Sequence, residues 1–236
     1  MKPSLGLVVL SMLRFPTSLA FNHFFRVPIR SRAPSWTSIR TFGAPVGEEV
    51  EIDPGVVAGL EIIKYPDPRL RAPNSEIEVF DDELKAISKR MFQLMYEAVG
   101  VGLAAPQVGI NKRLMVYNEF GDSKKWLSEV VLVNPVIVES SPKEDLETEG
   151  CLSFPGVPED SQRKVKRHVW IKVEAKNLKG KSFKKKFTGW EARIFQHEYD
   201  HLEGVVYIDR LSKDHRAEVQ PRLDELITDF GPDGAL

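Results

Sequence analysis

The 236-residue sequence contains a single cysteine, Cys151, so a disulfide within the chain is impossible. The thiol is therefore either an inert small side chain in the core or a group with a chemical role. After residue 47 the sequence has no internal repeat and no low-complexity tract, so a repeat architecture is not expected there. The apolar run at residues 5–13 is too short to anchor the chain across a bilayer.

Acidic residues are absent from the first 47 positions, where six basic residues occur. Without this region, residues 48–236 carry a net charge of −7, compared with −1 for the whole chain. A domain that binds nucleic acid needs a basic surface, so no direct nucleic-acid binding is expected. The basic runs "KVKRH" (164–168) and "KKK" (184–186) are interpreted as solvated strand edges, where lysine discourages pairing between sheets.

The composition of residues 1–47 predicts a targeting leader that is removed from the mature protein. Residues 5–13 resemble a short secretory signal core, and the small residues near Ala20 fit a cleavage after that position. The Arg-rich segment from Phe21 resembles a transit peptide, and the combination is similar to the bipartite leaders of plastids surrounded by extra membranes. A plain mitochondrial or plastid presequence is the alternative. The expected location is therefore an organelle, with the plastid preferred and the mitochondrion as the alternative.

Residues 48–236 predict one catalytic domain of the α+β class, with antiparallel sheets packed around a central helix. The prolines of "YPDPRLR" (65–71) favour a turn and should stop any helix there. One short helix is expected in the C-terminal tail, within residues 217–236. Strands are expected at residues 113–118, 130–138, 169–175, 182–187 and 205–208.

Two helices are predicted with clear ends. Apolar residues recur every three or four positions over residues 82–98, and Gly100 follows as a candidate C-terminal cap. A second helix is predicted over residues 189–203, because "TGWE" (188–191) fits a capping box and Gly204 fits a C-terminal cap.

The second predicted helix carries the stretch "QHEYDHLEG" (196–204). Positions four apart on a helix project side by side, so His197 and His201 can share one metal ion. Glu198 lies next to them and can handle the proton of a metal-bound water. The alternative is that these are surface histidines on a charged helix.

A catalytic metal site needs a third protein ligand and one open position. A large class of metalloproteases supplies a third histidine at the position of Tyr207, but a phenol with a pKa of about 10 is a poor replacement. The other candidate is Cys151 in "EGCLSFPG" (149–156), whose thiolate is the ligand form near a cation. A Cys-His-His set accepts zinc, iron(II), nickel or cobalt, and the spacing does not choose among them.

A third segment, "GVGLAAPQVG" (100–109), directly follows the first helix. It is either a helix end with tight backbone packing or a loop that lets a substrate approach Gly100 and Gly102 closely. In the second case Gln107 offers an amide N–H to the substrate. The glycine spacing does not fit a phosphate-binding loop.

The segments "GVGLAAPQ", "EGCLS" and "QHEYDH", in this order, resemble the three signature motifs of peptide deformylase. The resemblance covers roughly residues 58–212 and is closest to the type 1 branch of bacteria and plant organelles. It implies removal of the formyl group from the N-terminal formyl-methionine of new polypeptides, with release of formate. The implied substrates are N-formyl-methionyl nascent peptides, with transient contact to the organellar ribosome and no membrane partner.

The resemblance also implies roles for individual residues. Glu198 would take the proton of the metal-bound water and pass it to the departing amine. The side chain of Gln107 and the backbone N–H of Leu152 would stabilise the oxyanion, an effect of about 3 kcal/mol for one donor. The metal, usually iron(II) in this family with zinc, nickel or cobalt also accommodated, would be held by Cys151, His197 and His201.

The spacing of the helix suggests how a methionine side chain is bound. Trp190 and Ile194 share a stripe with the two histidines, which predicts an apolar pocket beside the metal. Packing in the core is the alternative for Trp190. The predicted substrate-binding residues are Gly100, Val101, Gly102, Trp190 and Ile194.

The sequence departs from the family pattern in "VPEDSQRKVKRH" (157–168), which is about four residues longer than the organellar type and lacks its Arg-Pro pair. In this segment Arg167 is expected to pair with Glu149 and brace the cysteine loop. Two other functions are alternatives to the deformylase. A zinc endopeptidase is disfavoured by Tyr207, and a non-catalytic ribosome-associated or nascent-chain-binding protein has no need for Glu198.

Overall fold

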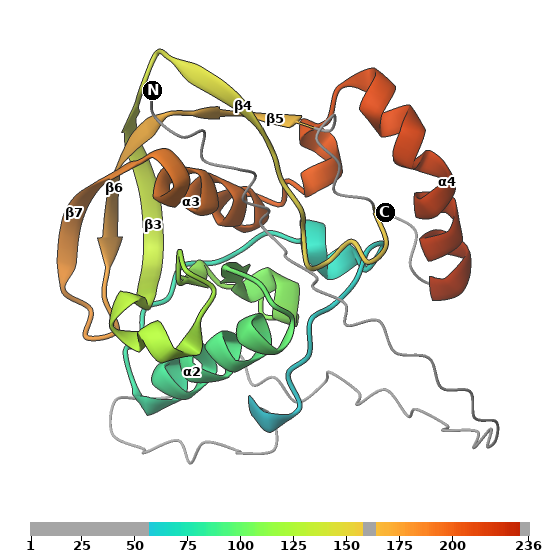
Figure 1. Cartoon of the computed structure of the whole chain (residues 1–236). Coiled ribbons are helices and arrows are strands. Elements are labelled where there is room, and N and C mark those ends of the chain that lie inside the picture. The colour runs from blue at the N-terminus through green and yellow to red at the C-terminus, as the bar shows by residue number, and fades with distance from the viewer. Residues whose placement is uncertain (1–56, 158–163, 232–236) are drawn as a thin grey trace. The chain divides into compact units, whose positions relative to one another are not determined.

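The computed structural model describes residues 57–157 and 164–231, so the expected leader lies outside the described residues (Figure 1). The helices are α2 (Asp82–Glu97), α3 (Gly189–Leu202) and α4 (Lys213–Phe230). Short 3-10 helices are η2 (Pro68–Arg71), η3 (Ala105–Val108), η4 (Ser123–Ser128) and η5 (Tyr207–Arg210). The strands are β1 (Gly102–Ala104), β2 (Leu114–Tyr117), β3 (Val130–Ser140), β4 (Glu144–Thr148), β5 (Lys164–His168), β6 (Trp170–Lys176) and β7 (Ser182–Thr188).

The strands form two antiparallel sheets, which confirms the predicted α+β class. Five strands pair in the order β1-β2-β3-β6-β7, and β4 pairs with β5 in a separate two-stranded sheet. In β6 the side chains alternate, with Ile171, Val173 and Ala175 buried on one face and Lys172 exposed on the other. This period of two is what a sheet with one covered face requires.

Helix α3 lies against the covered face of the five-stranded sheet (Figure 1). Its residues Ala192, Ile194 and Phe195 are fully buried in a cluster with side chains of β2, β3, β6 and β7. The helix ends as predicted, because Gly204 adopts a left-handed φ of 70° just beyond it. The predicted capping box is wrong: Thr188 makes no side-chain cap bond, and the Glu191 carboxylate accepts from the Tyr117 hydroxyl at 2.8 Å instead.

Helix α2 begins as predicted, with the Asp81 side chain accepting a hydrogen bond from Leu84 N at 3.0 Å. Its end differs from the prediction, because the left-handed residue is Val99, with φ of 58°, and not Gly100. Gly100 is needed for space: a Cβ there would lie 2.7 Å from Leu152 Cδ1. The helix therefore runs directly into the segment that borders the cysteine loop.

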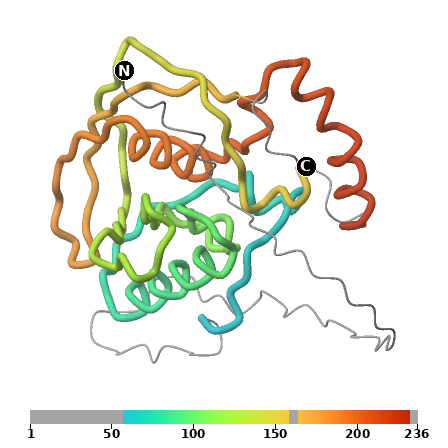
Figure 2. Tube along the Cα trace, viewed as in Figure 1, coloured from blue at the N-terminus to red at the C-terminus, as the bar shows by residue number. Residues whose placement is uncertain are grey.

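Residues that precede α2 in the chain make hydrogen bonds to the C-terminal end of α3. The amide nitrogen of Asn74 donates to the carbonyls of His201 and Leu202 at 3.1 and 3.0 Å. The trace of residues 60–75 accordingly passes beside the end of α3, although the two segments are far apart in the sequence (Figure 2). The prolines of residues 65–71 were expected to stop any helix, but a short helix, η2, forms there with Asp67 as its N-terminal cap.

Two further expectations about the C-terminal part are wrong. Residues 205–208 are not a strand: Tyr207 begins helix η5, and the apolar run reflects burial of Val206, Tyr207 and Ile208 in a core cluster. The tail helix is not short, because α4 has 18 residues and starts before the predicted region. None of the helices in the described ranges is both long and apolar enough to cross a bilayer.

Candidate metal centre

The four-residue spacing of His197 and His201 on α3 places their rings side by side, with centroids 5.4 Å apart. Cys151 comes from the loop after β4, and its Sγ lies 3.4 Å from His201 Nε2. One ligand atom from each of Cys151, His197 and His201 lies within 4.8 Å of the others, and all three side chains are buried. The predicted cluster is confirmed, with Cys151 and not residue 207 as its third member.

The three side chains fit a divalent metal ion. Two ligands on one tetrahedral zinc, with bonds of about 2.3 Å to sulfur and about 2.0 Å to nitrogen, lie about 3.5 Å apart. The separation between Cys151 Sγ and His201 Nε2 is 3.4 Å. Burial and the neighbouring charges of His197 and Arg167 lower the pKa of His201 well below its usual value, which favours the neutral ring that binds metal.

Glu198 lies beside this cluster with almost no exposed surface. Burial raises the pKa of its carboxyl group to about 7, a value suited to accepting and returning a proton near neutral pH. Among the described residues, its Oε2 atom is buried without a hydrogen-bond partner. The backbone leaves room for this carboxylate only because residue 102 is glycine, where a Cβ would lie 2.4 Å from Glu198 Oε1.

A small pocket opens beside Glu198 and His197. The Gln107 side chain is fixed on one wall, because its Oε1 accepts from Ala104 N at 2.8 Å. This bond directs Nε2 towards Cys151 Sγ at 3.7 Å and Ser153 Oγ at 3.3 Å. Leu152 is held by Lys64, whose Nζ donates to the Leu152 carbonyl at 2.7 Å. The pocket is lined by Gly102, Gln107, Gly150, Leu152, His197 and Glu198.

Glu149 orients the first histidine. Its carboxylate, which has no exposed surface, accepts from His197 Nδ1 at 3.0 Å and from Arg167 through two bonds of 2.9 Å. Burial opposes ionisation, but Arg167 and the hydrogen bond from His197 hold the pKa of Glu149 well below its usual range. A charged partner on Nδ1 leaves Nε2 of His197 available to a metal. The predicted pair of Arg167 and Glu149 is confirmed.

Two more buried charges complete this network, and sequence reasoning missed both. Arg193 Nη1 donates to Glu149 Oε1 at 2.7 Å and to the Val165 carbonyl at 3.0 Å. Asp200 accepts from Arg167 at 2.6 Å. The sequence did carry a signal for Arg193: it lies four residues before His197 and therefore on the same side of α3.

The residues expected to bind substrate fall into two groups. Gly102 lines the pocket, and Gly100 and Val101 precede it directly in the chain. Ile194 has no exposed surface, and Trp190 packs against the same core cluster, with its indole nitrogen donating to the Glu119 carbonyl at 3.0 Å. Contact between these two side chains and a substrate stays a prediction.

Comparisons with known proteins agree with this geometry. Residues 59–217 match the family described as polypeptide deformylase. The chain is 44% identical over 167 residues to peptide deformylase 1B, chloroplastic, of Oryza sativa subsp. japonica, covering 71% of this chain and 60% of the rice protein. Identity is also 44% over 167 residues to peptide deformylase 1B, chloroplastic/mitochondrial, of Arabidopsis thaliana, covering 71% of this chain and 59% of that protein.

Solved structures give the same result. A peptide deformylase from Plasmodium falciparum superposes with a TM-score of 0.69 at 42% identity, covering 72% of this chain and 96% of that chain. The chain spans about 60% of the length of the two plant relatives. With a matching family over most of its length and the Cys-His-His cluster in place, the chain belongs to the peptide deformylase family.

Proposed function

We propose that this protein removes the formyl group from the N-terminal formyl-methionine of nascent polypeptides and releases formate. The observation that carries the proposal is the position of Glu198, a buried carboxylate that shares a pocket with His197 beside the Cys-His-His cluster. A structural carboxylate buried this deeply is normally paired. A proton acceptor facing a reaction site is the role that explains its burial.

When bound, a divalent ion would act as a Lewis acid and lower the pKa of the attacking water. Cys151, His197 and His201 would hold it, and Glu149 keeps His197 in the orientation that this requires. Glu198 would take the proton from the attacking water and deliver it to the departing amine nitrogen. Its pKa of about 7 lets one carboxylate serve first as base and then as acid.

Two donors are proposed to stabilise the charge that develops on the formyl oxygen. Gln107 Nε2 is directed towards the pocket because the other end of the amide is fixed to Ala104. Leu152 also lines the pocket and would offer its backbone N–H, and Lys64 donates to the carbonyl of the same residue. Donors fixed before the reaction lower the barrier without reorganisation, and each is worth about 3 kcal/mol.

The native metal, the partner and the location are proposed from the family. Iron(II) is the proposed ion, with zinc, nickel and cobalt as alternatives for the same donors. Residues 1–47 are proposed to be a removable leader to the plastid, with the mitochondrion as the alternative, and formylated chains would be met at the organellar ribosome. Fusing residues 1–47 to a fluorescent protein tests whether they direct a protein to the organelle. Retention of the fusion in the cytosol would contradict this targeting role.

The activity is tested on residues 48–236 purified without oxygen. We expect formate release from formyl-Met-Ala-Ser together with one divalent ion per chain. Glu198→Ala should lower kcat about 100-fold to 10,000-fold, as expected for loss of a general base, with the metal content unchanged. Cleavage of unformylated peptides without formate release would favour the endopeptidase, and full turnover by Glu198→Ala would remove the proposed role of Glu198.

A further inference from the structure

Positive charge is concentrated in one part of the chain. Residues 164–190 contain nine lysines and one arginine but a single acidic residue, a net charge of +9, whereas the rest of residues 48–236 has a net charge of −16. Arg167 is used in the buried network at Glu149. The nine lysines are left, and all of them except Lys176 are exposed. The overall acidic charge of the protein therefore hides a strongly basic region.

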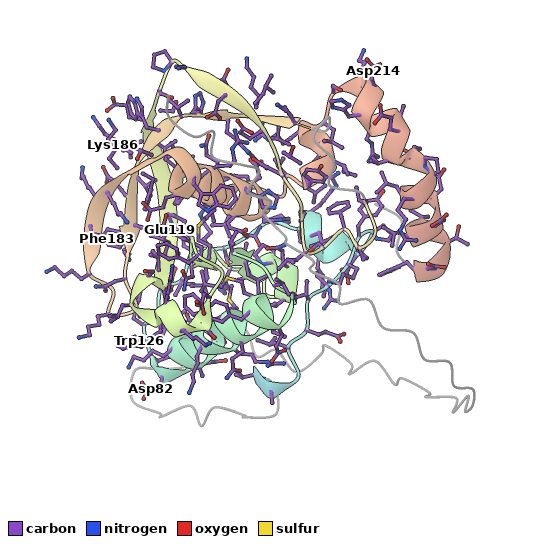
Figure 3. The ribbon with its side chains drawn as sticks, viewed as in Figure 1. Asp82, Glu119, Trp126, Phe183, Lys186 and Asp214 are labelled. Atoms are coloured by element: carbon purple, nitrogen blue, oxygen red, sulfur yellow. The ribbon has the colours of Figure 1, made fainter. Side chains whose placement is uncertain are left out.

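Four of these lysines lie on the sheet face that α3 does not cover. In β6, Lys172 and Lys176 alternate with the buried residues of that strand. Register pairs Lys172 with Lys186 and Glu174 with Lys184 across to β7, so these side chains share the open face. Figure 3 shows Lys186 on β7, at the edge of the sheet. We call the surface formed by Trp170, Lys172, Glu174, Lys176, Lys184 and Lys186 the lysine face; it carries four lysines and one glutamate.

Protection of a sheet edge does not account for the lysine face. Lysine on β7 can discourage pairing with another chain, because β7 is an edge strand. Lys172 is on β6, which is paired on both sides with β3 and β7. It also stands directly opposite Lys186, and like charges in that position destabilise a sheet. Edge protection therefore does not explain Lys172, and we look for a role in binding.

The chemistry of the lysine face indicates which class of partner it can bind. Lys172 and Lys186 Nζ lie 5.8 and 4.2 Å from the centre of the Trp170 ring, so ammonium groups cover this ring and it is not a free platform for base stacking. Exposed lysines on a sheet suit phosphate groups, whose contacts are independent of sequence. The apolar side chains beside them, Val136 and Val138, do not form the large wedge that insertion into a bilayer requires.

We propose that the lysine face binds the phosphate backbone of folded RNA, contrary to the expectation drawn above from the net charge of residues 48–236. The lysines are free to do so, because their acidic partners are exposed as well: Lys172 pairs with Glu139 and Lys184 with Glu174 through solvent-accessible contacts. Such surface pairs are weak and exchange readily. The biological setting rests on the proposed function, since formylated chains emerge from RNA-rich ribosomes. A basic face on an otherwise acidic protein would also orient the enzyme during encounter.

Binding is measured by fluorescence anisotropy, with metal-loaded residues 48–236 and a labelled RNA hairpin at several salt concentrations. We expect binding by the unaltered protein at 0.1 M salt or below. Replacing Lys172, Lys184 and Lys186 with Gln should weaken it at least tenfold and should reduce the slope of log K against log salt by about two to three, since each lost phosphate contact removes about 0.7 to 0.9. A matched control replaces three exposed lysines of other elements, Lys89, Lys124 and Lys213.

The control variant should bind RNA within about twofold of the unaltered protein. Formate release from formyl-Met-Ala-Ser should be equal in all three proteins, so loss of the lysine face is separated from failure of the proposed chemistry. The single change Lys186→Gln and a melting curve for each variant guard against unfolding. Equal loss of binding in both triple variants, no RNA binding by the unaltered protein, or binding to vesicles containing phosphatidylglycerol in place of RNA would overturn the proposal.

Discussion

At the scale of single residues, the position of Glu198 depends on the absence of a side chain at Gly102. A Cβ added at this position would lie 2.4 Å from Glu198 Oε1, so Gly102→Ala must displace the carboxylate. We predict that kcat falls at least about 100-fold, because a general base acts only within hydrogen-bond reach, while the metal content stays unchanged. Formate release and metal analysis test this. Gly231→Ala is the control: the φ of 89° strains the added methyl group locally, but a Cβ there meets nothing within 4 Å, so activity should be kept.

A second prediction at this scale concerns Glu149. Glu149→Gln removes the negative charge that compensates two buried guanidinium groups, those of Arg167 and Arg193. Arg167 keeps Asp200 as a partner and Arg193 keeps Asp145, so we expect a loss of about 1–3 kcal/mol in the free energy of unfolding. Loss of the charged partner of His197 should weaken metal binding about 10-fold to 100-fold. Denaturant unfolding and metal titration measure both effects.

The control for this change is Glu144→Gln. Glu144 pairs with Lys166 at the surface, where solvent screens the two charges and the pair contributes little to stability. Its free energy of unfolding and its metal affinity should therefore stay close to those of the unaltered protein. Equal effects of the two changes would mean that the buried network does not support the metal centre.

The sequence predicted the metal-binding residues because their chemistry is restricted and their spacing on a helix is regular. It could not tell whether Ile194 borders a pocket or only packs in the core, since a stripe on α3 shows which residues share a side but not what covers them. The structure places Ile194 in the core without exposed surface. Ile194→Asp would bury an unpaired carboxylate in this core and should unfold the protein.

At the scale of elements, α4 ties the C-terminal region to the cysteine loop. Val219, Leu223 and Leu226 are buried in the cluster that contains Cys151, and Arg222 Nε donates to the Pro155 carbonyl at 3.0 Å. We predict that Leu223→Ala lowers the free energy of unfolding by about 2–5 kcal/mol, as for other buried leucines.

Urea unfolding of the variant measures this loss. Leu127→Ala is a matched control, because the same side chain is removed from a position that is 82% exposed, and it should change stability by at most about 0.5 kcal/mol. If both variants are equally stable, α4 does not contribute to the core as described.

Most regular elements of the described residues were predictable from their apolar patterns. Helices α2 and α3 carry a period of 3.6 and β6 a period of two, whereas β2 is buried at every position. These elements, with β3 and β7, occur close to the expected positions. Residues 205–208 are apolar throughout, so their period is uninformative, and the structure places η5 there. Strands β1 and β4 are short or largely exposed, and their existence depends on pairing with strands elsewhere in the sequence.

At the scale of the whole molecule, metal binding should add to the stability of the fold. The ligands come from α3 and from the loop after β4, which are distant in sequence, so a bound ion favours only the folded state. At a metal concentration 1,000 times Kd the gain is about 4 kcal/mol. Removing the ion with a chelator should lower Tm by about 10 °C. An unchanged Tm in calorimetry would mean that the ion does not bind between these elements.

The central claim is that one sulfur and two imidazole nitrogens hold a metal beside Glu198. X-ray absorption at the metal edge of anaerobically purified protein tests it most directly. For a zinc-loaded sample we predict one sulfur neighbour at about 2.3 Å and two nitrogen neighbours at about 2.0 Å, with the sulfur signal lost in Cys151→Ser. A metal surrounded only by oxygen and nitrogen in the unaltered protein would contradict the account.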